Sequence, residues 1–152
     1  MLWLIAATLF VFAIAGGWSR LVELEAGAAT AGGFAQWRAQ AARDRMLASP
    51  GVEHHAWGGT SEVGSGDVVW DPRTQRGFLR LKRFVANDPA TARYQLWIFD
   101  AARDDGHAVD GGVFDLPAGR DEVVIPVHPT LPVSRAVAFA VTVEHGPRPT
   151  IH

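Results

Sequence analysis

The clearest pattern of hydrophobic and polar positions lies at residues 94–100, Tyr-Gln-Leu-Trp-Ile-Phe-Asp. Read with the two-residue period of a strand, Tyr94, Leu96 and Ile98 share one face, and Trp97 and Phe99 share the other. Apolar residues on both faces are typical of a strand in the middle of a sheet beneath a second layer. The pattern therefore predicts a central strand, with Trp97 as a core centre because a buried Trp removes so much surface from water.

A second segment, Ala136–Glu144, alternates between large apolar side chains and small or polar ones. Alternation of this kind indicates a strand with one buried face. With a contribution from the predicted strand Gly112–Leu116, the two segments define the predicted structural core. Its residues are Tyr94, Leu96, Trp97, Phe99, Phe114, Phe139, Val141 and Val143.

The remaining strand-like segments are short and are separated by turns rich in Gly, Pro, Asn and Asp. The predicted strands are Val52–Trp57, Asp67–Asp71, Gly77–Arg83, Arg93–Asp100, Gly112–Leu116, Glu122–Val127 and Ala136–Glu144. About seven short strands at this spacing favour an all-β fold, an immunoglobulin-like antiparallel β-sandwich. Because the chain has no Cys pair, Trp97 and Phe139 are expected to join the two sheets by packing alone.

The N-terminal segment Met1–Trp18 contains no charged residue and has Trp3 and Trp18 near its ends. As a helix it would span about 27 Å, which suits the hydrocarbon core of a bilayer and predicts a transmembrane anchor. A cleaved signal peptide is the alternative, with Ala13-Ile14-Ala15 as the small-residue site, although no basic residue precedes the apolar stretch. A buried helix of a soluble protein is the third reading.

Residues 20–50 lead from this segment to the predicted strands. Ala26–Gly33 is built of small residues and predicts a linker, and Phe34–Ala48 predicts a stalk helix that stops at Ser49-Pro50-Gly51. The helix is interpreted as a solvated stalk that packs lightly on the domain, with a membrane-surface helix using its arginines (Arg38, Arg43 and Arg45) as the alternative. The expected organisation is an anchor at 1–19, linker and stalk at 20–50, and a β-sandwich domain at 51–152.

The net charge and the lack of Cys exclude several classes of function. The net charge of −2 and the pI near 6.3 give no electrostatic footprint for nucleic acid. The chain has no Cys, which excludes disulfides, iron–sulfur clusters and Cys-based zinc sites.

Candidate chemistry is sparse. His54 and His55 are adjacent on a predicted strand and point to opposite faces, so they are not expected to ligate one metal. The acidic loop Asp100–Gly111 lacks the spacing of a calcium-binding loop, and a solvated hairpin loop is favoured over a calcium site. The remaining histidines (His107, His128, His145 and His152) and the serines Ser61, Ser65 and Ser134 follow no catalytic or ligand pattern. We therefore expect no catalytic, cofactor-binding or metal residue, no cofactor, and no enzyme activity.

Several of these segments, taken in order, resemble the C-terminal domain of the anti-sigma-K factor family. They are Tyr94-Gln95-Leu96-Trp97, then Gly111-Gly112-Val113-Phe114, then Phe139–Glu144 with Pro149-Thr150 after it. The resemblance covers about residues 52–150, and the matched positions look structural. Full-length members of that family have an N-terminal cytoplasmic sigma-binding domain, and no segment of this sequence corresponds to it.

The resemblance implies a single-pass cell-membrane protein whose β-sandwich lies outside the cytoplasm and regulates a sigma factor through a missing cytoplasmic part. Its implied partners are the membrane, a sigma factor, and envelope and intramembrane proteases. The small-residue stretches Gly16-Gly17 and Ala26–Gly33 are the expected cleavage sites because they unfold easily, with an inert tether as the alternative. Charge alone favours the opposite orientation, because Arg20 follows the apolar segment, but Glu23 and Glu25 offset it. A free-standing cell-envelope binding module, tethered or secreted, is the alternative function.

Overall fold

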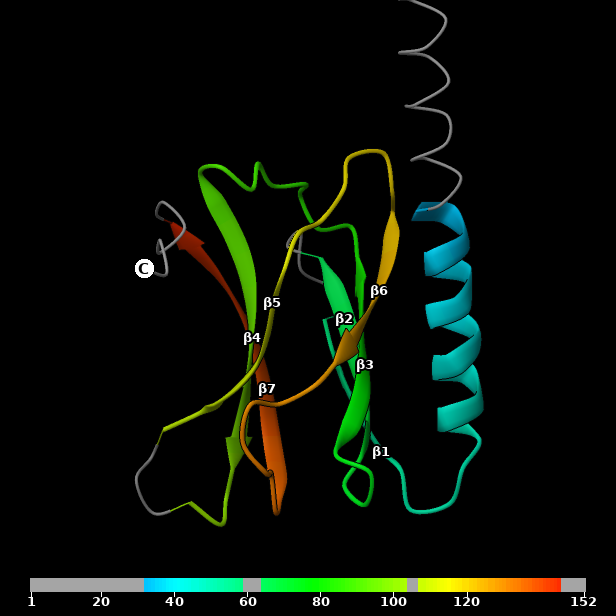
Figure 1. The fold of residues 1–152 in the computed structure, drawn as a ribbon, viewed down its shortest axis with the longest axis vertical. Coiled ribbons are helices and arrows are strands. Elements are labelled where there is room, and N and C mark those ends of the chain that lie inside the picture. Colours follow the sequence, from blue (N-terminus) through cyan, green and yellow to red (C-terminus); the bar gives the residue numbers. More distant parts are fainter. Residues whose placement is uncertain (1–31, 59–63, 104–106, 146–152) are drawn as a thin grey trace, which may run out of the picture. The chain divides into compact units, whose positions relative to one another are not determined.

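The computed structural model describes residues 32–58, 64–103 and 107–145. Residues 32–47 are helical, and seven strands follow (Figure 1). The strands are β1 (Glu53–Trp57), β2 (Ser65–Asp71), β3 (Arg76–Lys82), β4 (Ala92–Asp100), β5 (Val109–Phe114), β6 (Glu122–Val127) and β7 (Ala136–His145). The seven predicted strands are all present, the largest difference being that β5 begins and ends earlier than expected.

The strands form two antiparallel sheets that face each other, which confirms the two-sheet, all-β part of the prediction (Figure 1). Sheet A has the strand order β1-β2-β3-β6, and sheet B has the order β5-β4-β7. As expected, β4 is the central strand of its sheet.

The prediction of an immunoglobulin-like sandwich is wrong in its strand order. In immunoglobulin domains the second and third strands lie in opposite sheets, whereas here β2 and β3 form a hairpin within sheet A. The turn explains the difference: the carboxylate of Asp71 accepts bonds from the Arg73 N–H and the Thr74 hydroxyl, both at 3.0 Å. Gln75, in the left-handed region with φ 55°, then closes the turn and anchors it to Val133 through two hydrogen bonds. So short a connection favours pairing of neighbouring strands over a crossing to the other sheet.

The core between the sheets is centred on Trp70, which is fully buried with Val68 and Leu79. Of the predicted core, Tyr94, Leu96 and Phe114 are buried, and Phe139 and Val141 pack against the core while partly exposed. The remaining three lie outside it: Trp97, Phe99 and Val143.

The prediction that Trp97 and Phe99 lie in the core is wrong. They point away from sheet A, where no described element covers them, so Trp97 is only half-buried and Phe99 is 40% exposed. Trp97 does not join the sheets, and its indole N–H instead donates to the Thr142 hydroxyl on the same sheet at 3.0 Å. Val143 faces inward but is 44% exposed because β7 is an edge strand.

The chain divides into two compact units, Met1–Arg38 and Ala39–His152, and the boundary falls within the helix. In the first unit, the rings of Phe34 and Trp37 stack at 5.8 Å and both side chains are exposed. The predicted anchor Met1–Trp18 and its signal-peptide alternative lie outside the described residues. Among the residues that are described, no helix has the length and apolarity needed to cross a membrane.

Candidate functional site

A cluster of polar and charged side chains around the buried Asp67 lies on the outer face of sheet A, and we call it the Asp67 cluster: Arg43, His54, Asp67 and Arg80. Asp67 on β2 stands opposite Arg80 on β3, whose Nε donates to the Asp67 carboxylate at 2.8 Å. Arg43 comes from the helix and donates through Nη2 to the other oxygen of the same carboxylate. The ring of His54 lies farther off, with Nε2 at 3.7 Å from Asp67 Oδ1.

Burial decides the energetics of this cluster, because Arg43 is 2% exposed and Asp67 is 5% exposed. Burial alone would raise the pKa of Asp67, but hydrogen bonds from Arg43 and Arg80, together with their charges, outweigh it and hold the pKa below its ordinary value. The carboxylate is therefore ionised at neutral pH. Removing one partner of such a pair leaves a buried charge poorly compensated, which is costly.

The cluster fastens the helical residues from Ala39 onward to the sandwich through a single cation. The Nε of Arg43 has no hydrogen-bond partner among the described residues, so the side chain does not satisfy all its donors in this position. The helix was expected to pack lightly on the domain, with its arginines facing away from the apolar stripe. The burial of Arg43 against Asp67 is a closer contact than that expectation.

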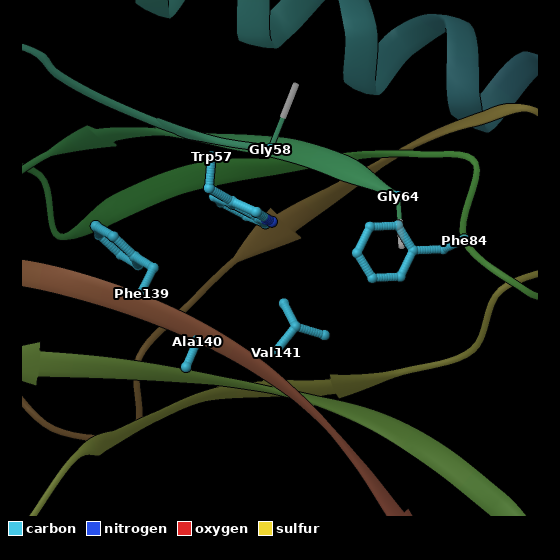
Figure 2. A pocket seen from close by; sticks show the side chains of 7 residues that line it. All are labelled: Trp57, Gly58, Gly64, Phe84, Phe139, Ala140 and Val141. Carbon is cyan, nitrogen blue, oxygen red and sulfur yellow. The ribbon is translucent and has the colours of Figure 1, made fainter. Parts of the chain in front are cut away.

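A second feature is an apolar groove of about 400 Å³ between the facing edges β1 and β7 (Figure 2). Trp57 and Phe84 line it from the side of sheet A, and Phe139 and Val141 line it from β7. The Trp57 ring lies against Gly66, where any Cβ would come within 2.5 Å of the indole. Its lining is hydrocarbon and aromatic, so the groove can hold apolar side chains but offers no group for acid–base chemistry.

The two adjacent histidines lie on opposite faces of β1, as their spacing predicts. His54 points toward Asp67, whereas the His55 ring packs against Phe139 with 5.1 Å between ring centroids. Within residues 32–58, 64–103 and 107–145, no three His, Cys, Asp or Glu side chains gather closely enough to hold a metal ion.

The acidic loop is organised around the first of its carboxylates. Asp100 is buried and accepts bonds from the backbone N–H groups of Ala102, Ser134 and Arg135 at 2.8–3.0 Å. These hydrogen bonds hold the pKa of Asp100 below its ordinary value even though burial opposes them. Asp100 therefore fixes the loop to the start of β7, while residues 104–106 lie outside the described part.

The candidate serines are not brought to a catalytic base. Ser65 begins β2, and the backbone N–H of Ser134 serves the Asp100 carboxylate. Ser61 lies outside the described residues.

Sequence reasoning missed the Asp67 cluster, although a signal for it was present. Asp67 directly precedes the apolar run Val68, Val69 and Trp70 within its strand. A carboxylate within such a run needs a cation or several N–H donors, because an unpaired buried charge is too costly. Arg80 in the next strand was the obvious partner, whereas only the fold could bring Arg43 to it.

A family model described as anti-sigma-K factor rskA, C-terminal, matches residues 2–152 of the chain. The match extends beyond the motifs in the second half of the sequence and takes in the apolar N-terminal segment and the helix. Among curated proteins and among solved structures, none matches the chain significantly.

Proposed function

The chain belongs to the anti-sigma-K factor family, in its C-terminal part, and from this membership we propose that it is the membrane-anchored regulatory domain of an anti-sigma factor. In this proposal Met1–Trp18 is a single membrane span, and the β-sandwich at 51–152 lies outside the cytoplasm. The sigma-binding part is cytoplasmic and is not included in this sequence. Controlled proteolysis between sandwich and membrane releases that part.

Support for the membrane span comes from the sequence and from the start of the helix. Met1–Trp18 is uncharged and of bilayer length. Phe34 and Trp37 are both more than half exposed, with the guanidinium of Arg38 over the Phe34 ring. Exposed aromatics beside a cation suit the headgroup region of a membrane, where such residues gather.

The observation that carries the regulatory mechanism is the docking of the helix through the buried Asp67 cluster. The segment that proteases must reach, Ala26–Gly33, ends in the first residues of this helix. Proteases need a locally unfolded backbone. While Arg43 is bound to Asp67, its contact holds the C-terminal half of the helix on sheet A and opposes unfolding of the helix. When this contact breaks, the helix can unfold and Ala26–Gly33 becomes accessible to proteases. The sandwich thus acts as a gate on cleavage.

The test uses the complete protein in cells, with tags at both ends and immunoblotting of the fragments. Arg43→Ala removes the docking cation and should raise the fraction of cleaved protein several-fold, with a matching rise in sigma-dependent transcription. Arg45→Ala is the matched control, because Arg45 lies on the same helix and is exposed. Equal cleavage of the two variants would refute the gate.

A second variant should change cleavage in the opposite direction. Gly32 is helical, and a Cβ there would meet nothing within 4 Å, so Gly32→Ala should stiffen the helix without a clash. We expect slower cleavage in this variant. Retention of the wild-type chain in the membrane fraction after an alkaline wash tests the anchor separately from the gate.

A tethered cell-envelope binding module is the second candidate, and the apolar groove between β1 and β7 favours it. This function would leave the chain intact in the cell, whatever happens to the Asp67 cluster. A membrane-held protein that yields no fragment in the wild type or in Arg43→Ala would favour the binding module over the regulator.

A further inference from the structure

The four edges of the sandwich differ in how well they are protected against pairing with another strand. An unpaired edge exposes backbone donors and acceptors, and proteins usually blunt it by shortness, Pro, charge or a bulge. Strand β1 is five residues long and carries Glu53 and two histidines. Strand β5 is interrupted by a register shift and has Gly112 at φ 121°, and β6 contains Pro126.

The fourth edge, β7, has none of these protections over most of its length. It is ten residues long and contains no Pro, Gly or Lys, and its one carboxylate, Glu144, is next to its end. A register shift affects only its start, so residues Ala138–Glu144 pair regularly with β4. In the part of the chain that the structure describes, β4 is its only partner.

The inward side chains of β7 are also incompletely covered. Phe139 and Val141 line the groove, and Val143 is 44% exposed. Figure 2 shows Phe139 and Val141 directed from β7 toward Trp57 and Phe84. An additional strand beside β7 would extend sheet B and cover these side chains from the open side.

We propose that this additional strand is β7 of a second copy of the chain, paired antiparallel about a two-fold axis at Val141. A two-fold interface must be complementary to itself. With Val141 opposite its own copy, Phe139 stands opposite Val143 of the partner, so the inward pairs between residues 139 and 143 are all apolar. The two three-stranded sheets then form one continuous sheet.

The outward positions and the charges fit the same register. Ala140 stands opposite Thr142, which places small side chains across the interface. Glu144 stands opposite Ala138, so the two carboxylates lie at opposite ends of the paired strands and do not repel each other. Any peptide with apolar residues at alternate positions could cover the inward face. A second copy of β7 matches the outward face as well, and this favours a copy of this chain as the partner. One strand pair is a small interface, and we therefore expect a dimer whose population rises with protein concentration.

The absence of Cys from the sequence makes this register directly testable by cross-linking. Residues that stand opposite in an antiparallel pair have Cα atoms about 4.5–5.5 Å apart, within the range of a disulfide. In the full chain, purified in a mild detergent and treated with a mild oxidant, Val141→Cys should form a disulfide-linked dimer. Val113→Cys is the control, because Val113 is 47% exposed on β5, the other edge of sheet B, and should stay monomeric.

Two exposed positions refine the test. In the proposed register, Ala138 is about 20 Å from Ala138 of the copy, and Glu144 is as far from its own counterpart. Neither Ala138→Cys nor Glu144→Cys should therefore cross-link alone, whereas a mixture of the two chains should give the mixed disulfide. Cross-linking of Val141→Cys without the mixed disulfide would overturn the proposed pairing.

The last arm measures the dimer without cross-links, by sedimentation of the full chain over a range of concentrations. Val143→Lys places a charge on the exposed inward face and should leave only monomer, with a melting temperature close to that of the wild type. Ala140→Lys, on the outward face, serves the same purpose if Val143→Lys does not fold. A wild-type chain that is monomeric throughout, with Val141→Cys cross-linking no better than Val113→Cys, would overturn the proposal.

Discussion

Strands β2 of sheet A and β4 of sheet B both bury the residues that face the other sheet. They differ in whether the residues of the outer face are buried. On β4 the inward residues Leu96 and Ile98 are buried, while Phe99 on the outer face is 40% exposed although it is aromatic. On β2 both faces are buried from Asp67 to Asp71, even though these two outward residues are acidic. Hydrophobicity of a face therefore does not by itself decide its burial.

The reason lies in what covers each outer face. Arg43, from the helix, lies over Asp67 on sheet A and neutralises it, so a carboxylate is tolerated beneath the covering residues. Nothing in the described part of the chain covers Trp97 and Phe99 on sheet B. A polar residue is buried where a partner covers it, and an aromatic residue stays exposed where nothing does.

The largest expected effect on the free energy of unfolding comes from replacing a tryptophan by alanine, and the two tryptophans are compared one at a time. Trp70→Ala should lower the free energy of unfolding by about 3–5 kcal/mol, because it empties a fully buried site. Trp97→Ala should cost about 1 kcal/mol, mainly the hydrogen bond to Thr142. Denaturant unfolding of the full chain in detergent measures both, and equal losses would contradict the assignment of Trp70 as the core centre.

A smaller effect is expected from the cation that covers sheet A. Arg43→Ala should cost about 1.5–3 kcal/mol, since it removes a buried hydrogen bond to a charged group while Arg80 still compensates Asp67. The exposed neighbour Arg45 provides the control, and Arg45→Ala should change the free energy of unfolding by about 0.5 kcal/mol or less. If the two variants unfold together, the helix is not fastened through Arg43.

The smallest effect is a pH dependence that distinguishes the two outer faces. The pKa of Asp67 is lowered in the folded state, so its stabilising contribution is present above its ordinary pKa of 3.8 and is lost as the pH falls through the folded-state value. The wild-type melting temperature should therefore fall on acidification below about pH 4. The melting temperature of Asp67→Asn should fall less over the same pH range. A residual pH dependence should remain from Asp100, whose pKa is lowered as well. Identical pH profiles of wild type and Asp67→Asn would show that the cluster does not contribute.

Much of the fold could be predicted from local patterns because strands and turns depend on residues close in sequence. Glu122–Val127 was predicted with its observed bounds, and Arg93–Asp100 and Ala136–Glu144 differ from β4 and β7 by one residue. The helix predicted at Phe34–Ala48 is present at residues 32–47. Period-two alternation also placed Tyr94, Leu96 and Phe114 in the core.

The candidate site was less accessible to this reasoning. Asp67 was treated as the start of a strand and Arg43 as one of several surface arginines, because their sequence separation of 24 residues leaves no local signal. The groove has the same origin: Trp57, Phe84 and Val141 come from separate segments that only the packing of the two sheets brings together.

The sequence by itself determined where strands and turns form, that the domain is antiparallel β, and that no disulfide stabilises it. These properties follow from side-chain alternation, turn residues and composition, which act over a few residues. The tertiary structure alone decided which face of each strand is covered and that Trp70 rather than Trp97 is the core centre. Burial depends on which distant element lies against a face, and the alternation of a strand shows only that it has two faces.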